Sequence, residues 1–229
     1  MEEKAFCIPA NAFFMRTLTI NLLLLVLLSV LGAGWLSFSK KGKRALTFSG
    51  SKIPNRYQLP SKEFLKLQTK AVTAKAFIKQ RGFATSFCFL IDMSLPANHQ
   101  RFFVYNLVKD TIENSGLVAH GNCNRYWLEG RRYGNEVGCG CTSLGKYKVG
   151  SSYYGRFGLA FKLYGLDTTN SNAYKRYVVL HSHDCMPDAE TEDEVCQSNG
   201  CPMVSPEFLK QLEPLVKNAR KPVLLWIFD

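Results

Sequence analysis

The stretch HSHDCMPDAETEDEVCQSNGCP, residues 181–202, places two histidines and three cysteines on either side of an acidic loop. Residues of these types can hold a metal ion, form a disulfide, or supply the nucleophile and base of a catalytic site. Each of the three predicts a different fold and function. The rest of the chain has to decide between them.

The overall composition allows one large domain or two small ones. The chain has 229 residues, of which 46% are apolar and 13% aromatic, so it can bury a sizeable core. Its net charge of +11 suits an anionic partner such as nucleic acid, acidic lipid or an anionic cell-wall polymer. The basic residues show no zinc-finger spacing, RNA-binding signature or basic helix with heptads. We therefore predict no nucleic-acid partner.

The N-terminal part of the chain contains a long apolar segment. Between Arg16 and Lys40 there are 23 residues without a charge, centred on LLLLVLLSVL. Such a segment is a signal peptide or a single membrane-spanning helix. A basic cluster directly after it favours the cytoplasm by the positive-inside rule, which argues against export. We predict a signal peptide or N-terminal membrane anchor over 1–39, a linker over 40–60 and a folded domain over 61–229.

The number of cysteines bears on the compartment and on reactivity. Cys7 lies in the targeting segment, which leaves seven cysteines in the rest of the chain. Disulfides persist in an exported protein, and an odd number predicts one free thiol, a candidate nucleophile. A bridge between Cys185 and Cys196 would staple the acidic loop, and Cys88 and Cys123 are possible partners. Connectivity stays open, because it cannot be read from sequence.

The secondary structure predicted for the folded domain is mostly β. Apolar residues at helical spacing predict a helix from residue 61 to the glycine at 82. Ser205, Pro206 and Glu207 begin a second helix, which Pro214 is expected to end or kink. Short apolar runs divided by turn residues predict strands at 86–95, 100–108, 116–121, 145–150, 158–166, 175–182 and 223–228.

A metal site in the opening stretch would use His181, His183 and Cys185 as one group of ligands. Cys196 and Cys201 would be the second group. The spacing is tolerable but matches no standard zinc site, and it requires reduced thiols, which export disfavours. We therefore predict no metal, and keep a zinc-stabilised binding module as an alternative.

A catalytic site uses the same stretch differently. His181 ends a buried strand, and Cys201 follows Gly200 in a tight turn. A thiol needs a base to become a thiolate at neutral pH, and histidine is the usual one. The glycine would let the N–H groups of Gly200 and Cys201 point at one spot as an oxyanion hole.

With these motifs the sequence resembles the YkuD-type L,D-transpeptidase catalytic domain, in particular the murein L,D-transpeptidase-like branch common in Bacteroidetes. That family's signature is a histidine, about 14–17 residues, and then Ser/Thr-x-Gly-Cys. Here His181 is followed by 16 residues and then Ser198-Asn199-Gly200-Cys201. An upstream Thr/Ser-x-x-Gly-x-Tyr/Phe element is matched by TSLGKY, residues 142–147. The resemblance runs from about residue 83 to about residue 213.

The resemblance implies a mostly β catalytic domain of sandwich type with a few short helices. Cys201 would attack a peptidoglycan stem peptide before its terminal D-residue and form a thioester. The amine of a second stem, a D-amino acid or water would then take the acyl group. His181 would be the base, oriented by the carbonyl of Ser182. The N–H groups of Gly200 and Cys201, with that of Asn199 as a further candidate, would hold the oxyanion. No cofactor is implied, and carbapenem β-lactams are expected inhibitors.

The residues expected to bind substrate come from the same motifs: Ser198, Asn199, His120, Ser143, Tyr147 and Arg176. The chain departs from the commoner family pattern at Asn199, where a second histidine is usual. Pro202 and Met203 stand where an apolar residue and then Arg or Asn are common. The substrate carboxylate would then need another partner, for which Arg176, Lys175 and His120 are candidates.

We therefore predict an exported, cysteine-dependent L,D-transpeptidase in the periplasm or cell envelope, tethered to the membrane if its N-terminal segment is not cleaved. The alternative from another class is a non-catalytic cell-wall-binding protein on the same fold. The acidic loop, residues 188–194, is interpreted either as a solvated loop or as an attractor for the acceptor amine.

Overall fold

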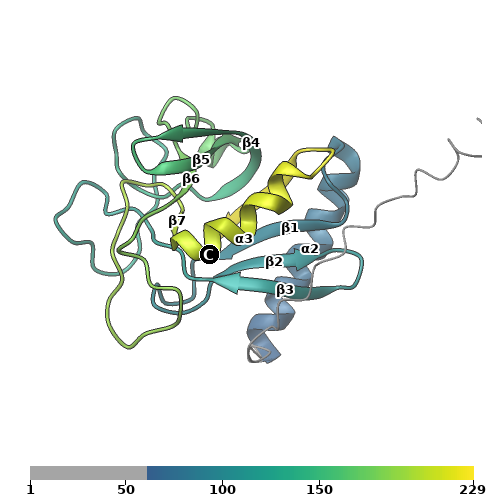
Figure 1. Ribbon diagram of the computed structural model, residues 1–229, viewed down its shortest axis with the longest axis horizontal. Helices are drawn as coiled ribbons and strands as arrows, with labels where there is room; N and C mark the ends of the chain where they lie inside the picture. Colours follow the sequence, from purple (N-terminus) through teal and green to yellow (C-terminus); the bar gives the residue numbers. More distant parts are fainter. Residues whose placement is uncertain (1–60) are drawn as a thin grey trace, which may run out of the picture. The chain divides into compact units, whose positions relative to one another are not determined.

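The computed structural model describes residues 61–229, so the predicted anchor at 1–39 and linker at 40–60 lie outside the described residues. In residues 61–229, no helix combines the length and apolar character needed to cross a membrane. The elements, shown in Figure 1, are α2 (Ser61–Arg81), β1 (Phe87–Asp92), β2 (Phe102–Asn106), β3 (Thr111–Gly116), β4 (Gly145–Gly155), β5 (Gly158–Gly165), the 3₁₀ helix η1 (Thr168–Asn170), β6 (Val179–Ser182), β7 (Met203–Val204), α3 (Pro206–Lys217) and β8 (Val223–Phe228).

The prediction of a mostly β domain with a few helices is confirmed. The strands form one mixed sheet in place of two separate ones, with the order β3-β2-β1-β8-β4-β5-β6-β7. β1 runs parallel to β8, and β6 runs parallel to β7. The neighbours elsewhere in the sheet are antiparallel.

The two α-helices cover opposite faces of the sheet. Side chains alternate between faces along a strand, and in β1 Cys88 and Leu90 pack with α2, whereas Phe89 and Ile91 pack with α3. The apolar stripe of α2 comprises Leu67, Ala71, Ala74 and Ile78, and that of α3 includes Phe208, Leu209 and Leu212. This arrangement gives the domain a core on each face of the sheet.

The predicted helix boundaries are largely confirmed. Gly82 follows α2 with φ of +72°, a conformation that suits glycine at the end of a helix. The side chain of Ser205 accepts a hydrogen bond from the N–H of Phe208 and caps α3. Pro214 was expected to end or kink the second helix, and the first of these alternatives is wrong, because α3 continues through it to Lys217.

One predicted strand is misplaced. The run at 116–121 was expected to be a strand, but the strand is β3 at Thr111–Gly116, and residues 117–120 have no regular structure. β3 is polar because it is an edge strand of the sheet. Leu117, Val118 and Ala119 are nevertheless buried, so their apolar character reflects burial and not strand pairing.

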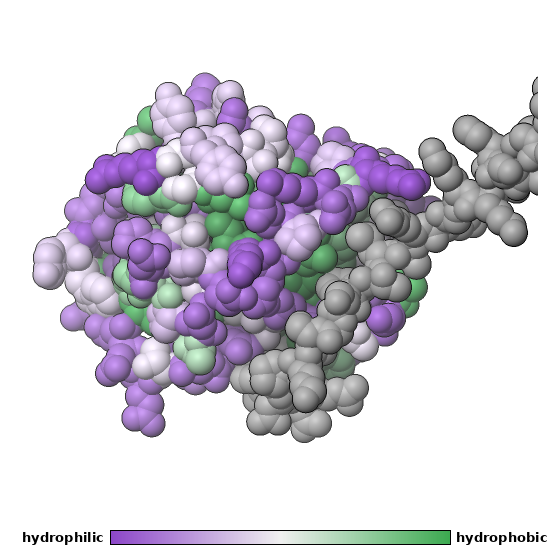
Figure 2. Space-filling model, in the orientation of Figure 1, coloured by the Kyte–Doolittle hydropathy of each residue, from purple (hydrophilic) through white to green (hydrophobic). Residues whose placement is uncertain are grey.

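The face of the domain shown in Figure 2 is mostly hydrophilic. Hydrophobic residues show between the hydrophilic ones near its middle. Most large apolar side chains lie instead in the two cores on either side of the sheet.

Candidate active site

β6 and β7 bring the predicted catalytic pair together. The two strands are parallel, with His181 opposite Met203, and the N–H of His181 donates to the carbonyl of Pro202 at 3.4 Å. Cys201 therefore stands just before β7, beside the start of β6. The N–H of Val179 donates to Cys201 Sγ at 3.5 Å. Because side chains alternate along a strand, those of Val179 and His181 share one face of β6.

The thiol of Cys201 lies in a sheltered, polar-lined position. It donates to the carbonyl of Tyr177, with 3.8 Å between sulfur and oxygen. Burial raises the pKa of the Cys201 thiol, and the Val179 N–H and the charge of Arg176 act in the opposite direction. The resting sulfur is therefore a thiol, which needs a base before it can attack.

His181 is held in the tautomer that such a base requires. Its Nδ1 lies 3.0 Å from the carbonyl oxygen of Ser182. A carbonyl can only accept, so Nδ1 carries the proton, and in the neutral ring Nε2 is left as the proton acceptor. Burial lowers the pKa of His181, although the Ser182 carbonyl acts to raise it. The imidazole is thus neutral at pH 7. The ring of Phe157 stacks on it, with 4.9 Å between ring centroids.

The turn that carries the thiol depends on glycine. Gly200 has φ of +104°, and a Cβ there would lie 2.6 Å from the carbonyl oxygen of Cys141. The Ser198 hydroxyl accepts from the Gly200 N–H at 3.1 Å and donates to the Cys201 carbonyl at 2.7 Å. Ser198 thus shapes the turn.

The same contact changes the predicted oxyanion hole. The Gly200 N–H was expected to hold the oxyanion, but Ser198 already engages it. Among the hydrogen bonds found within residues 61–229, none uses the N–H of Asn199 or Cys201. These two groups are the N–H donors that remain for an oxyanion.

Three residues expected to bind substrate have internal roles in this structure. Arg176 donates to the carbonyl of Gly134 at 2.9 Å, to the carbonyl of Cys141 and to the hydroxyl of Ser143. Ser143 is buried, as is Tyr147, whose hydroxyl donates to the Ser143 carbonyl at 2.7 Å. We therefore assign Ser143 and Tyr147 a structural role in place of substrate contact. Arg176 ties the segment before β6 to the loop that contains Gly134, Cys141 and Ser143.

The remaining two predicted substrate-binding residues lie beside the turn that carries the thiol. The carbonyl of His120 accepts from the Ser198 N–H at 2.9 Å, which aligns its segment with the turn. Its imidazole Nδ1 lies 3.2 Å from Nη2 of Arg101. Asn199 is exposed, and its side-chain oxygen accepts from Asn122 at 3.4 Å.

Comparison with known protein families gives a match over most of the chain. Residues 60–226 match the family described as L,D-transpeptidase catalytic domain. The chain belongs to the L,D-transpeptidase catalytic-domain family. No curated protein matches the chain.

Solved structures similar to this L,D-transpeptidase-family chain include LD transpeptidase LdtMt1 in complex with imipenem, with 13% identity, a TM-score of 0.38 and coverage of 62% of this chain and 59% of that one. The cell shape determining protein Pgp2 from Campylobacter jejuni has 13% identity, a TM-score of 0.37 and coverage of 75% and 57%. A fused Zn-dependent amidase/peptidase and peptidoglycan-binding protein from Clostridium acetobutylicum has 10% identity, a TM-score of 0.34 and coverage of 74% and 63%. The matches thus span about three fifths of each of these chains.

The disulfides of this L,D-transpeptidase domain confirm one pairing and correct another. Cys185 and Cys196 are bridged, as predicted. Cys123 pairs with Cys141, so the possible pairing of Cys88 with Cys123 does not form. Cys88 is fully buried in β1, where its side chain packs beneath α2.

The count of free thiols also differs from the prediction of one. Within residues 61–229 the free cysteines are Cys88, Cys139 and Cys201. The disulfide removes Cys185 and Cys196 from the set of possible zinc ligands. In the part of the chain that the structure describes, no three His, Cys, Asp or Glu side chains come together as metal ligands would.

Sequence reasoning missed two members of the site. Phe157 stacks on His181 because it lies at the turn between β4 and β5, and Ala160 of β5 pairs with His181. The turn GRFG could be recognised in the sequence, but the pairing of β5 with β6, which brings Phe157 to His181, could not. Tyr177 contributes through its backbone carbonyl and has a positive φ, which no sequence pattern marks.

Proposed function

We propose that this protein is a cysteine-dependent L,D-transpeptidase that acts on peptidoglycan stem peptides through a thioester acyl-enzyme. The observation that carries the proposal is the position of Cys201 just before the strand that pairs with His181, an imidazole whose Nδ1 is held by the Ser182 carbonyl. This contact leaves the neutral Nε2 of His181 as the base on the strand beside the thiol. Membership of the family supports the same chemistry.

In the first step Cys201 Sγ attacks the carbonyl carbon that precedes the terminal D-residue. The thiol proton passes to Nε2 of His181. A C–S bond forms as the C–N bond to the D-residue breaks, and the imidazolium returns the proton to the departing amine. The Ser182 carbonyl stabilises the transient imidazolium through Nδ1–H.

In the second step the amine of another stem, a D-amino acid or water attacks the thioester. Its proton passes to His181, the new C–N or C–O bond replaces the C–S bond, and Cys201 regains its proton. Both steps pass through a tetrahedral oxyanion, for which the N–H groups of Asn199 and Cys201 are the proposed donors.

We further propose that the protein works outside the cytoplasm, in the periplasm or cell envelope. The two disulfides found within residues 61–229 fit an oxidising compartment, and the family is associated with the cell wall. The apolar segment between Arg16 and Lys40 would serve as signal peptide or membrane tether.

The proposal is tested by intact-mass spectrometry of the purified 229-residue chain after incubation with imipenem. A single adduct is expected. It should vanish in Cys201→Ala, form far more slowly in His181→Ala and persist in Cys139→Ala, which removes another free thiol. An unmodified wild-type chain with a free Cys201 would refute the proposed nucleophile and favour a non-catalytic cell-wall-binding protein.

A further inference from the structure

A disulfide and a free thiol lie together beside the nucleophile turn, residues 198–201. In the part of the chain that the structure describes, Cys123 and Cys141 are bridged and Cys139 is free. The sulfur of Cys139 accepts a hydrogen bond from the Cys141 N–H, with 3.4 Å between the two atoms. A Cβ on Gly134 would lie 3.3 Å from Cys139 Sγ and 3.4 Å from Cys141 Cβ, so the free thiol and the bridged residue share the space over this glycine.

The backbone places Cys123 between two possible partners. Its N–H donates to the carbonyl of Gly140 at 3.0 Å, and Gly140 separates Cys139 from Cys141. A Cβ on Gly140 would lie 2.9 Å from the backbone nitrogen of Asn124, so the two segments are in close contact. A cysteine therefore stands on either side of the residue to which Cys123 is bonded. Cys139 can replace Cys141 as the partner of Cys123 after a short movement.

The local backbone also favours a change of partner. Cys123 has φ of +52°, a strained conformation for a residue other than glycine, which persists only while the surrounding contacts hold it. Cys139 is half-buried, and a Cβ on the preceding Gly138 would meet nothing within 4 Å. The segment that bears the free thiol thus borders open space. Strain on one side and room on the other both assist an approach of the thiol to the bridge.

Both halves of the bridge lie on segments that contact the nucleophile turn. Cys123 directly follows Asn122, whose N–H donates to the carbonyl of Ser198 at 2.8 Å. On the other segment, the carbonyl oxygen of Cys141 would lie 2.6 Å from a Cβ on Gly200. The bridge therefore fastens together the two segments against which the turn is packed.

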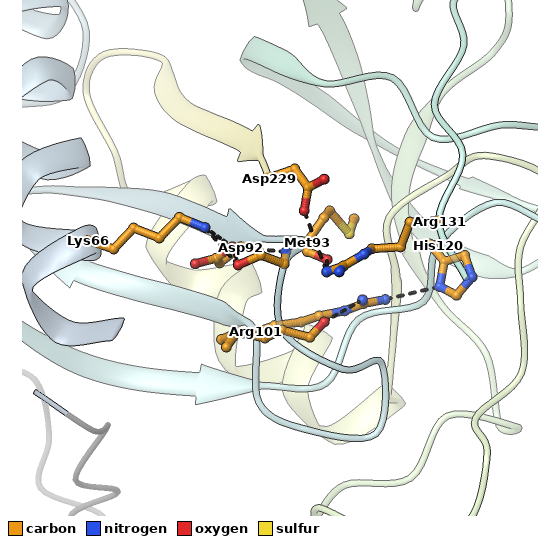
Figure 3. A network of polar contacts seen from close by, with 9 residues as sticks. Lys66, Asp92, Met93, Arg101, His120, Arg131 and Asp229 are labelled. Carbon is orange, nitrogen blue, oxygen red and sulfur yellow. Dashed lines mark hydrogen bonds and ion pairs between the residues drawn. The ribbon is translucent and has the colours of Figure 1, made fainter. Parts of the chain in front are cut away.

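The rest of the loop that the bridge closes is held by contacts of its own. Arg131 donates to the carbonyl of Met93 at 2.6 Å and forms an ion pair with Asp229 at 3.5 Å, as Figure 3 shows. The N–H and carbonyl of Leu128 both bond to the side-chain amide of Gln197, at 2.9 and 2.8 Å. A change of partner within the bridge would therefore leave most of the loop docked and act mainly beside the nucleophile turn.

We propose that Cys139, Cys123 and Cys141 form a thiol–disulfide exchange site that controls the nucleophile turn. The thiolate of Cys139 attacks Sγ of Cys123, a new S–S bond forms as the old one breaks, and Cys141 leaves as a thiolate. The proton that Cys139 loses is balanced by the one that Cys141 gains, and there is no net oxidation. The folded protein therefore has two disulfide isomers. In the first, Cys123–Cys141 clamps the turn, and in the second, Cys123–Cys139 releases the Cys141 segment.

The exchange changes how well the site is assembled. In the second isomer the carbonyl of Cys141 can withdraw from Gly200, so the turn loses one of its walls. A shift of about 1 Å at a reacting group costs about 100-fold in rate. Because a thiolate is the attacking group, the exchange accelerates as the pH rises. The effect on acylation rests on the proposed function, whereas the exchange itself does not.

The first test maps the bridges in the purified 229-residue chain. Wild type is incubated for several hours at mildly alkaline pH, quenched in acid and digested with pepsin, since protonated thiols do not exchange. Tandem mass spectrometry should find both Cys123–Cys141 and Cys123–Cys139, while the Cys185–Cys196 bridge stays intact as the internal control. Cys139→Ser should show Cys123–Cys141 alone. Wild type that shows only Cys123–Cys141 after the incubation would overturn the proposal.

The second test follows imipenem adduct formation at Cys201. Uncatalysed exchange takes minutes to hours, so the two isomers should react as separate populations. Wild type should give two phases that differ by roughly tenfold or more in rate, with amplitudes that match the mapped proportions. Cys139→Ser should give the fast phase alone, and Cys141→Ser, which leaves Cys123 and Cys139 to pair, the slow one. If Cys141→Ser does not fold, the comparison of wild type with Cys139→Ser still decides.

A single phase in wild type with both bridges present would overturn the assigned control of the turn. If wild-type Cys201 is not acylated at all, the proposed function fails, and iodoacetamide replaces imipenem as the probe. Alkylation of Cys201 depends on the position of the thiol and requires no transpeptidase chemistry. Two alkylation phases in wild type and one in Cys139→Ser would support the exchange site. The same single phase in both proteins would overturn its control of the turn.

Discussion

Replacing Gly200 with alanine tests whether the turn at residues 198–201 positions the nucleophile. At φ of +104° a Cβ is strained, which costs about 1–2 kcal/mol. The new Cβ would also lie 2.6 Å from the Cys141 carbonyl oxygen and 2.9 Å from Nη2 of Arg176. Overpacking of this kind costs about 1–3 kcal/mol. Gly200→Ala should therefore lower the free energy of unfolding by roughly 2–5 kcal/mol.

The same variant should lose a larger share of its activity than of its stability. The Cys141 carbonyl that the new Cβ meets is anchored by Arg176, so the turn that carries Cys201 must move instead. A displacement of about 1 Å at a reacting group costs about 100-fold in rate. Urea unfolding followed by tryptophan fluorescence gives the first quantity, and the rate of imipenem adduct formation gives the second.

Gly82→Ala is the matched control for Gly200→Ala. Gly82 also has a positive φ, +72°, but a Cβ there meets nothing within 4 Å, and it follows α2, outside the site. It should lose about 1–2 kcal/mol of stability and acylate at the wild-type rate. A folded Gly200→Ala that acylates within twofold of wild type would show that the turn does not place the thiol.

Three further predictions follow from the same contacts. Phe157→Ala should admit water to His181 and raise the pKa of His181 toward the ordinary value of 6.5, which moves the acidic limb of the pH–rate profile to higher pH. Phe157→Leu should shift this limb less. An unmoved limb in Phe157→Ala would show that the stacked ring does not set this pKa. The double serine variant of Cys185 and Cys196, which are 11 residues apart, should lower the free energy of unfolding by roughly 2–3 kcal/mol in urea titrations, and an unchanged midpoint would contradict this. Cys88 is fully buried, with its thiol pKa raised to about 12, so peptide mapping should find it unmodified after native treatment with iodoacetamide; alkylation there would mean that α2 opens readily.

The fold could be predicted from sequence wherever a local pattern and its tertiary role coincide. The first helix, its end at Gly82 and the strands at β1, β4, β5 and β8 were all indicated by periodicity and turn residues. The prediction failed at residues 117–119, because burial in a loop gives the same apolar signal as a buried strand. One of the two alternatives at Pro214 also failed, because α3 continues to Lys217 despite the local tendency of proline to end a helix.

The candidate site was partly visible for a similar reason. The spacing of His181 and Cys201 singled out both residues, and the resemblance to the family implied the contact with the Ser182 carbonyl. Long-range contacts were not visible. The hydrogen bonds from Arg176 to the carbonyls of Gly134 and Cys141 depend on how segments far apart in the sequence pack together. No pattern within one segment encodes them.

The resting site pairs a protonated thiol with a neutral imidazole, and burial is the shared cause. Desolvation disfavours a thiolate on Cys201 and an imidazolium on His181, so it opposes the ion pair that would make the thiol reactive in the absence of substrate. The Ser182 carbonyl, the Val179 N–H and the charge of Arg176 each favour a charged form. Proton transfer should therefore accompany attack on a bound carbonyl, when the negative charge leaves sulfur for the oxyanion. A site built in this way spends little time as free thiolate, and so it would resist oxidation while retaining a base in place for the reaction.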